Sequence, residues 1–173
     1  MKILIVLILV LFFASLWDLK NGKIPNLLIV IGVLYGLMRM LYYQNLFAHI
    51  LGIMFPILIL YPFFKIGTIG AGDIKLFSLI GCYVSFMESI YCMFLAFILG
   101  AIFSLISMKQ KGHFTDRISY LMSYLKESFS QKQFRYYYQD LNKFSPMEIK
   151  KTKVHLALPI FVSVCIHLGG VFL

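Results

Sequence analysis

The sequence predicts an all-α, polytopic membrane protein with about six transmembrane helices and a long basic loop. Of its 173 residues, 61% are hydrophobic and only 13% are charged, and the mean hydropathy is +0.87. Soluble domains contain about half apolar and about a quarter charged residues. The apolar residues also gather into six runs separated by polar turns, and most basic residues fall in one connection. The length suits a single domain over residues 1–173.

Each apolar run is a candidate membrane helix, because a spanning helix needs about 20 apolar residues. The first run has a lysine near its start, as a signal peptide does. It ends in Leu16, Trp17 and Asp18 without a small-residue cleavage site, so we interpret it as a retained helix. The fourth run is short unless the glycines before it lie at membrane depth. The expected helices cover, in order, residues 3–17, 27–43, 46–64, 74–86, 87–107 and 154–173.

The positive charge predicts the orientation of the chain. The net charge is +9, and ten of the sixteen lysines and arginines lie between residues 108 and 153. Cytoplasmic loops of membrane proteins carry such an excess, so we expect loop 108–153 to be cytoplasmic. Alternation along the chain then places the turns at 18–26 and 65–73 on the same side and both termini outside. Topology therefore explains the charge, and the expected partner is the lipid bilayer rather than nucleic acid.

The basic loop has a helical pattern of its own. Its apolar positions recur at the spacing of one helix face, which predicts an amphipathic helix. This helix either lies along the membrane surface or packs on the helix bundle, and the pattern does not separate the two. The apolar positions are Ile118, Leu121, Met122, Leu125 and Phe129.

Cysteine and histidine are sparse and scattered. The three cysteines, Cys82, Cys92 and Cys165, sit singly in apolar runs, and no CxxC pair occurs. This predicts neither a disulfide framework nor a zinc site. The four histidines are also far apart in the sequence, which gives little support to a metal site or a Ser–His pair. We therefore expect no metal and no cofactor.

Two aspartates stand out among only seven acidic residues. Asp18 ends the first expected helix and Asp73 begins the fourth, so both are expected at the cytoplasmic edge of the bilayer. An ionisable side chain at that depth is costly and is a functional candidate by default. The structural alternatives are an ordinary interfacial residue for Asp18 and a helix N-cap for Asp73.

The glycines before Asp73 suggest what the pair does. Gly70 and Gly72 lack a β-carbon, so the backbone can turn sharply and another chain can approach closely. Such a segment can present a carboxylate to an extended peptide. Two neighbouring carboxylates at low dielectric share a proton. One then deprotonates a water while the other protonates or polarises the scissile carbonyl, which is aspartyl protease chemistry and needs no metal.

Two sequence motifs resemble those of type IV prepilin peptidases, which are GxGD intramembrane aspartyl peptidases. GAGDIKL, at residues 70–76, resembles the GxGD signature, and WDLKNGKIPN, at residues 17–26, resembles the other half of the family pattern. The resemblance implies that Asp18 and Asp73 are the catalytic residues. It also implies that Pro25 and Asn26 form the turn into the second helix. Lys75 matches a frequent basic residue of the signature, with snorkelling toward the headgroups as its structural alternative.

The function implied by this resemblance is a membrane-embedded aspartic endopeptidase. Such enzymes remove the basic leader from type IV prepilin-like or preflagellin-like precursors at the cytoplasmic face of the plasma (inner) membrane, in pilus assembly and protein secretion. Gly70 and Gly72 would then position the substrate backbone. The paired cysteines of larger members are absent, which resembles the short, peptidase-only branch of tight-adherence pili, competence pseudopili or archaeal flagellins. N-methyltransferase activity is therefore not expected.

Two other functions were weighed against this one. A non-enzymatic transporter or assembly subunit could use Asp18 and Asp73 as an ion or proton site, but a proton pathway should carry polar groups toward the middle of the bilayer. Presenilin-like enzymes pair GxGD with a Tyr-Asp motif inside a helix. Here the first acid follows Trp17 and lies near Pro25 and Asn26, which favours the prepilin class.

Overall fold

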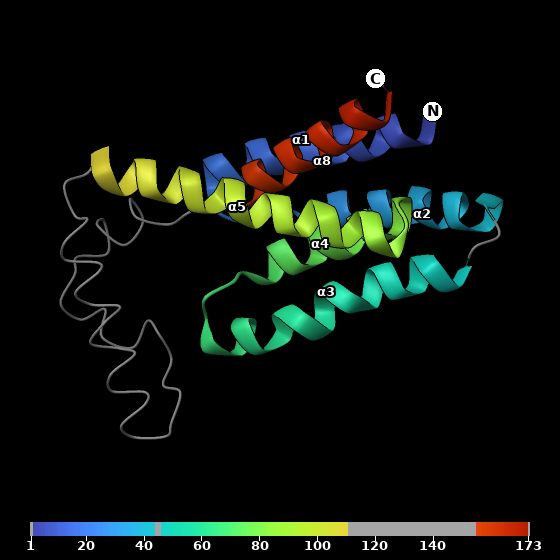
Figure 1. The fold of residues 1–173 in the computed structure, drawn as a ribbon, viewed down its shortest axis with the longest axis horizontal. Coiled ribbons are helices and arrows are strands. Elements are labelled where there is room, and N and C mark those ends of the chain that lie inside the picture. Colours follow the sequence, from blue (N-terminus) through green and yellow to red (C-terminus); the bar gives the residue numbers. More distant parts are fainter. Residues whose placement is uncertain (1, 44–45, 111–154, 173) are drawn as a thin grey trace.

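The computed structural model describes residues 2–43, 46–110 and 155–172, and every regular element in these ranges is an α-helix. Neighbouring helices in the chain run antiparallel and form one bundle (Figure 1). This arrangement confirms the predicted all-α class. The helices are α1 (Lys2–Asn21), α2 (Asn26–Tyr43), α3 (Leu46–Ile66), α4 (Ala71–Tyr83), α5 (Phe86–Gln110) and α8 (Ala157–Phe172).

Three of the described helices are long and apolar enough to cross a membrane. They are α1, α3 and α5, whereas α2 and α8 contain shorter apolar stretches, at Asn26–Leu41 and Ala157–Gly170. Helix α4 has 13 residues, which gives a length of about 20 Å against a hydrocarbon core of about 30 Å. Large apolar side chains such as Leu27, Phe47 and Met87 are exposed on the outside of the bundle. Helix length therefore supports three of the six predicted spans.

The short helix α4 is the centre of the bundle, because it contacts all five other helices. Its residues from Leu79 to Tyr83 are all buried. Glycines allow this close packing: a Cβ on Gly81 would overlap the Gly52 carbonyl of α3. On the α2 side, the Tyr83 hydroxyl donates a hydrogen bond to the Gly32 carbonyl at 2.7 Å. The helix that carries Asp73 is therefore fixed by its neighbours on several sides.

The connections gather at the two ends of the bundle. The α1–α2 turn, the α3–α4 turn and the start of α8 lie at one end, and both termini lie at the other (Figure 1). We call the first the motif end, defined by residues 18–26, 67–75 and 155–157. The two predicted motifs therefore share one end, as the predicted topology requires.

The boundaries of two helices differ from the prediction in ways that affect the site. Helix α1 continues to Asn21, so that Asp18 lies in its last turn. Helix α4 begins at Ala71 and ends at Tyr83, three residues earlier at each end than predicted. The N-cap position belongs to Gly70, so the alternative of Asp73 as an N-cap is wrong.

The physical reason for the early end of α4 lies in the residues that follow it. Val84 is extended, and the Ser85 backbone N–H donates to the Glu88 carboxylate at 2.8 Å. This bond caps the start of α5, so residues 84–85 connect the two helices and do not continue α4. Helix α5 also takes in residues 108–110, which the sequence assigned to the basic loop. The rest of that loop, with the amphipathic pattern at 118–129, lies outside the described residues.

Candidate active site

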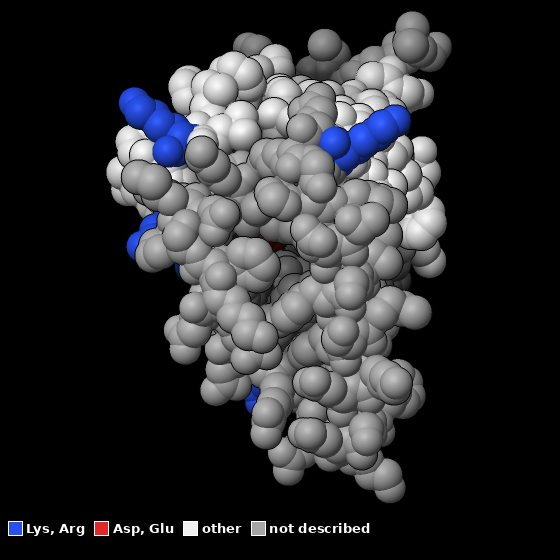
Figure 2. All heavy atoms as spheres, turned by 90° about the vertical axis from the view of Figure 1, so that its left-hand side faces the viewer, with Lys and Arg blue, Asp and Glu red and all other residues white. Residues whose placement is uncertain are grey.

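Basic side chains project from the motif end, where the acidic Asp18 is buried. In Figure 2, which views this end, blue lysine and arginine side chains project outward. Asp18 has a relative exposure of 6%.

Asp18 is held in place by the way α1 ends. The Gly22 backbone N–H donates to the Asp18 carbonyl at 2.7 Å, and Gly22 has the left-handed φ of 64°. Glycine favours this conformation and commonly ends a helix in this way. The last turn of a helix exposes carbonyl groups rather than N–H groups. The Asp18 carboxylate therefore needs a donor from elsewhere in the molecule.

That donor is His155, which lies two residues before the start of α8. Its ring nitrogen Nδ1 lies 3.1 Å from Asp18 Oδ2, and α8 packs against α1. Burying a carboxylate is costly unless it is paired and hydrogen-bonded, so this contact stabilises Asp18 in its buried position. Sequence reasoning missed His155, because 137 residues separate the partners and no spacing pattern links them.

Asp73 has a different environment, although it lies at the same end of the bundle. It occupies the first turn of α4 and is partly exposed. The N-terminal end of a helix favours a carboxylate, because its backbone N–H groups carry partial positive charge. Asp18 faces the opposite situation at the C-terminal end of α1. The two aspartates are thus chemically inequivalent.

Gly70 and Gly72 serve close approach rather than a sharp turn. Gly70 is extended with φ −77° and Gly72 is helical, and the left-handed turn before α4 is made by Gly67 at φ 81°. The predicted sharp turn at Gly70 and Gly72 is therefore wrong, because Gly67 already reverses the chain. A Cβ on Gly70 would lie 3.1 Å from Asp73 Oδ2, so Gly70 leaves room for that carboxylate.

Gly72 packs against the turn between α1 and α2. A Cβ on Gly72 would lie 3.0 Å from Ile24 Cδ1, closer than most real contacts. Glycine at this position therefore lets the turn that follows Asp18 pack directly on the start of α4. The first motif thus contacts the second through apolar atoms.

A polar contact joins the same two motifs. The Lys75 ammonium donates to Asn26 Oδ1 at 2.9 Å, so it does more than reach toward headgroups. Asn26 is the first residue of α2, and Pro25 directly precedes that helix. The structure therefore brings Lys75 and Asn26 together, and Pro25 directly precedes Asn26 in the chain.

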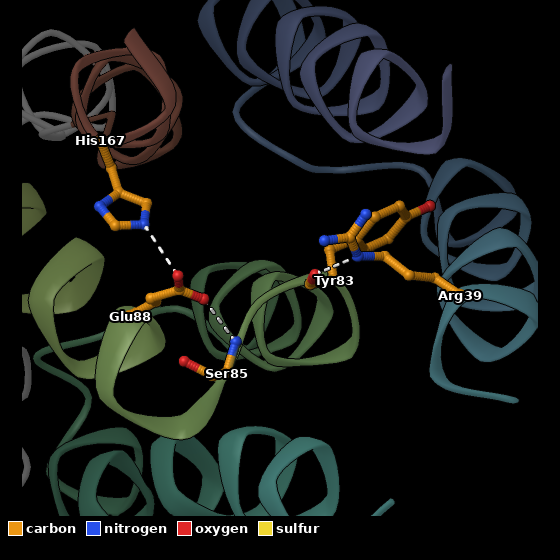
Figure 3. A network of polar contacts seen from close by, with 5 residues as sticks. All are labelled: Arg39, Tyr83, Ser85, Glu88 and His167. Carbon is orange, nitrogen blue, oxygen red and sulfur yellow. Dashed lines mark hydrogen bonds and ion pairs between the residues drawn. The ribbon is translucent and has the colours of Figure 1, made fainter. Parts of the chain in front are cut away.

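A second polar cluster lies at the other end of the bundle (Figure 3). Arg39 Nε donates to the Tyr83 carbonyl at 2.6 Å, and His167 Nε2 lies 4.0 Å from Glu88. Arg39 thus meets a carbonyl at the C-terminal end of α4, where positive charge is favourable. Glu88 receives the Ser85 N–H at the start of α5. These contacts complete helix ends, which is a structural role.

The ionisable side chains of the motif end are two carboxylates, one imidazole and three ammonium groups, those of Lys20, Lys23 and Lys75. Within the described ranges, no three His, Cys, Asp or Glu side chains lie together in a way that could hold a metal ion. Cys82 and Cys92 are buried and Cys165 is partly buried, each as a free thiol. The reactive chemistry that this end offers is that of the two aspartates and the histidine.

Comparison with protein families gives one match. A family model described as the type IV leader peptidase family matches residues 5–105. The match includes both motifs and most of α1 to α5, whereas His155 and α8 lie beyond it. No curated protein and no solved structure matches the chain.

Proposed function

Because the chain belongs to the type IV leader peptidase family, we propose that it is a membrane aspartic endopeptidase whose dyad is Asp18 and Asp73. Its substrates are prepilin-like precursors, from which it removes the basic leader at the cytoplasmic membrane face. The family supports a peptidase in general. The catalytic residues, the substrate and the membrane face at which cleavage occurs are our proposal.

The observation that carries this proposal is the double contact between the two motifs. Ile24 packs over Gly72, and Lys75 bonds to Asn26. These contacts tie the turn that follows Asp18 to the first turns of α4, which contain Asp73. Two acids placed at one end of a bundle by packed helices meet the first requirement of a dyad, since catalytic groups need rigid support.

The proposed reaction is hydrolysis of one peptide bond. One carboxylate accepts a proton from water as the water oxygen attacks the scissile carbonyl carbon. The other, protonated carboxyl donates its proton to the carbonyl oxygen, giving a neutral tetrahedral diol. When the C–N bond breaks, the amine leaves with a proton and the new acid forms. The dyad ends with one proton, as it began.

The substrate must reach the site in extended form, because a helical backbone engages its carbonyls in internal hydrogen bonds. Gly70 is exposed beside the Asp73 carboxylate and offers a place where a peptide backbone can come close. The substrate's apolar helix would lie in lipid against the exposed apolar side chains of the bundle. Its basic leader would remain beside anionic headgroups.

The ion or proton pathway has less support from the described helices. Two buried serines, Ser15 and Ser163, donate to carbonyls of their own helices at 2.8 Å. Such local bonds satisfy the hydroxyls and do not link one end of the bundle to the other. The polar side chains at the far end complete helix termini, as described above.

A cleavage assay with purified components tests the proposal. The protein is reconstituted with a precursor that carries a short basic leader, a glycine and an apolar helix. We expect mass spectrometry to show one cut, directly after the glycine, with no added metal or cofactor. Persistence of the intact precursor with wild-type protein, under conditions where the precursor is inserted in the same membrane, would contradict it.

A further inference from the structure

The polar side chain of His155 contacts Asp18, the buried aspartate of the proposed dyad. Its Nδ1 lies 3.1 Å from Asp18 Oδ2, and the two side chains have relative exposures of 26% and 9%. The histidine comes from the segment before α8, far beyond the matched residues 5–105. The environment of Asp18 is therefore completed by a part of the chain that carries neither motif.

The position of Asp18 explains why such a partner matters. Asp73 lies where a helix presents backbone N–H groups, but Asp18 lies where a helix presents carbonyls. A ring N–H from His155 supplies Asp18 with a donor that its own helix end lacks. The contact also engages one named oxygen, Oδ2, and so fixes the rotation of the carboxylate about its bond.

We propose that His155 is a positioning residue for the reaction: by donating from Nδ1 to Oδ2 it holds the Asp18 carboxylate in the orientation that activates water. This inference rests on the proposed function, in which Asp18 belongs to the dyad. His155 touches neither water nor peptide in this role. Its effect passes through Asp18 and therefore falls on the chemical step rather than on substrate affinity.

Two substitutions separate the hydrogen bond from the bulk of the ring. In His155→Asn the side-chain amide carries an N–H near the place of Nδ1. In His155→Leu the volume is similar, but no donor remains. We expect the leucine variant to lower kcat by about 10- to 100-fold, the scale of a misplaced catalytic group, with KM within about twofold of wild type. The asparagine variant should recover most of the loss.

The chain provides a matched control on the helix that follows His155. His167 lies on α8 and also approaches a carboxylate, that of Glu88 at 4.0 Å, but at the other end of the bundle. His167→Leu therefore makes the same histidine-to-leucine change without touching Asp18. We expect its kcat and KM to match those of wild type. Thermal inactivation in detergent is measured for every variant.

The outcomes are separable. A leucine variant with wild-type kcat overturns the positioning role, and so do leucine and asparagine variants that lose activity equally. If the leucine variant does not fold, His155→Gln replaces it. Its N–H sits one bond farther out, so a lower kcat for the glutamine variant than for the asparagine variant supports the proposal, and equal kcat values overturn it.

Asp18→Asn is run in parallel. Activity of that variant removes the proposed dyad itself, whereas its inactivity beside a fully active His155→Leu removes only the role of His155.

Discussion

Lys75 and Asn26, 49 residues apart in the sequence, are joined by a hydrogen bond of 2.9 Å between the lysine ammonium and the asparagine side-chain oxygen. The bond links the first two turns of α4 to the first residue of α2. It lies beside the apolar contact between Ile24 and Gly72. Together the two contacts join the motif around Asp18 to the motif around Asp73.

Breaking the polar contact should affect activity more than stability. Lys75→Met and Asn26→Leu each remove one partner of an exposed bond, and exposed polar pairs contribute about 0–1 kcal/mol. We expect each variant to lower kcat/KM by roughly 3- to 10-fold, because a small shift between the motifs misplaces the dyad. The double variant should be no worse than either single one. Cleavage rates and thermal inactivation of all three provide the measurement.

Lys20→Met is the control for charge at the motif end. Lys20 lies in the last turn of α1, and its loss removes one positive charge without removing the bond to Asn26. Its activity should stay near that of wild type. If Lys20→Met falls as far as Lys75→Met, positive charge rather than the specific bond is what matters.

The dyad predicts severe and non-additive effects of amide substitution. Asp18→Asn and Asp73→Asn keep the side-chain shape but remove the ability to exchange a proton. Each should lower kcat by on the order of a thousandfold or more, and the double variant should fall little further, since groups that act as a unit are not additive. Both proteins should still insert in the membrane. Substantial turnover by either single variant counts against the aspartyl mechanism.

The contact at Gly72 predicts a rescue. Gly72→Ala places a Cβ 3.0 Å from Ile24 Cδ1, so the Ile24 side chain must shift, against the roughly 0.5–1 kcal/mol that alanine gains over glycine inside a helix. We expect a several-fold loss of cleavage. Ile24→Val removes Cδ1, so the double variant Gly72→Ala with Ile24→Val should recover most of it. Absence of recovery would show that Ile24 is not what the added methyl meets.

Gly70 gives the contrasting case for the same assay. Its added Cβ would lie 3.1 Å from Asp73 Oδ2 rather than from an apolar side chain. Gly70→Ala should therefore displace the proposed catalytic carboxylate, and Ile24→Val should not restore activity. Equal rescue at both positions would contradict this division of roles between the two glycines.

Packing at the centre of the bundle predicts a loss of stability instead. A Cβ on Gly81 would overlap the Gly52 carbonyl, and backbone cannot move aside as a side-chain end can. Gly81→Ala should therefore destabilise the fold by about 1–3 kcal/mol or more. Gly170→Ala is the control, since nothing lies within 4 Å of its added Cβ. Thermal inactivation in detergent distinguishes the two, and similar values for both would contradict the close α3–α4 approach.

Much of the fold was predictable because lipid imposes a simple rule. Long apolar runs must satisfy their backbone groups internally and therefore form helices, which located every described helix to within a few residues. The two motifs were readable because each is a short continuous segment. The early end of α4 was not predictable from hydropathy, because it depends on the bond from Ser85 to Glu88.

The contacts between segments could not be predicted from one sequence. His155 carries no local signal, and it joins Asp18 only because α8 packs on α1. The same holds for Ile24, which lies inside a motif but gains its role from Gly72 on another helix. Local pattern identifies residue types, whereas tertiary packing decides which of them meet.

The position of Gly70 beside Asp73 predicts which substrates are cut. Gly70 is exposed and lies next to the Asp73 carboxylate, so the peptide backbone must come close to Asp73 for the carbonyl to react. A small residue before the cut permits this approach, whereas a bulky one holds the chain away from the dyad. Two precursors that differ only at this position, glycine or leucine, are offered to the reconstituted enzyme. We expect the leucine version to be cut at least about tenfold more slowly, mainly through kcat, because both share the apolar helix that supplies binding. Equal rates for the two precursors would mean that the space at Gly70 serves the packing of Asp73 alone.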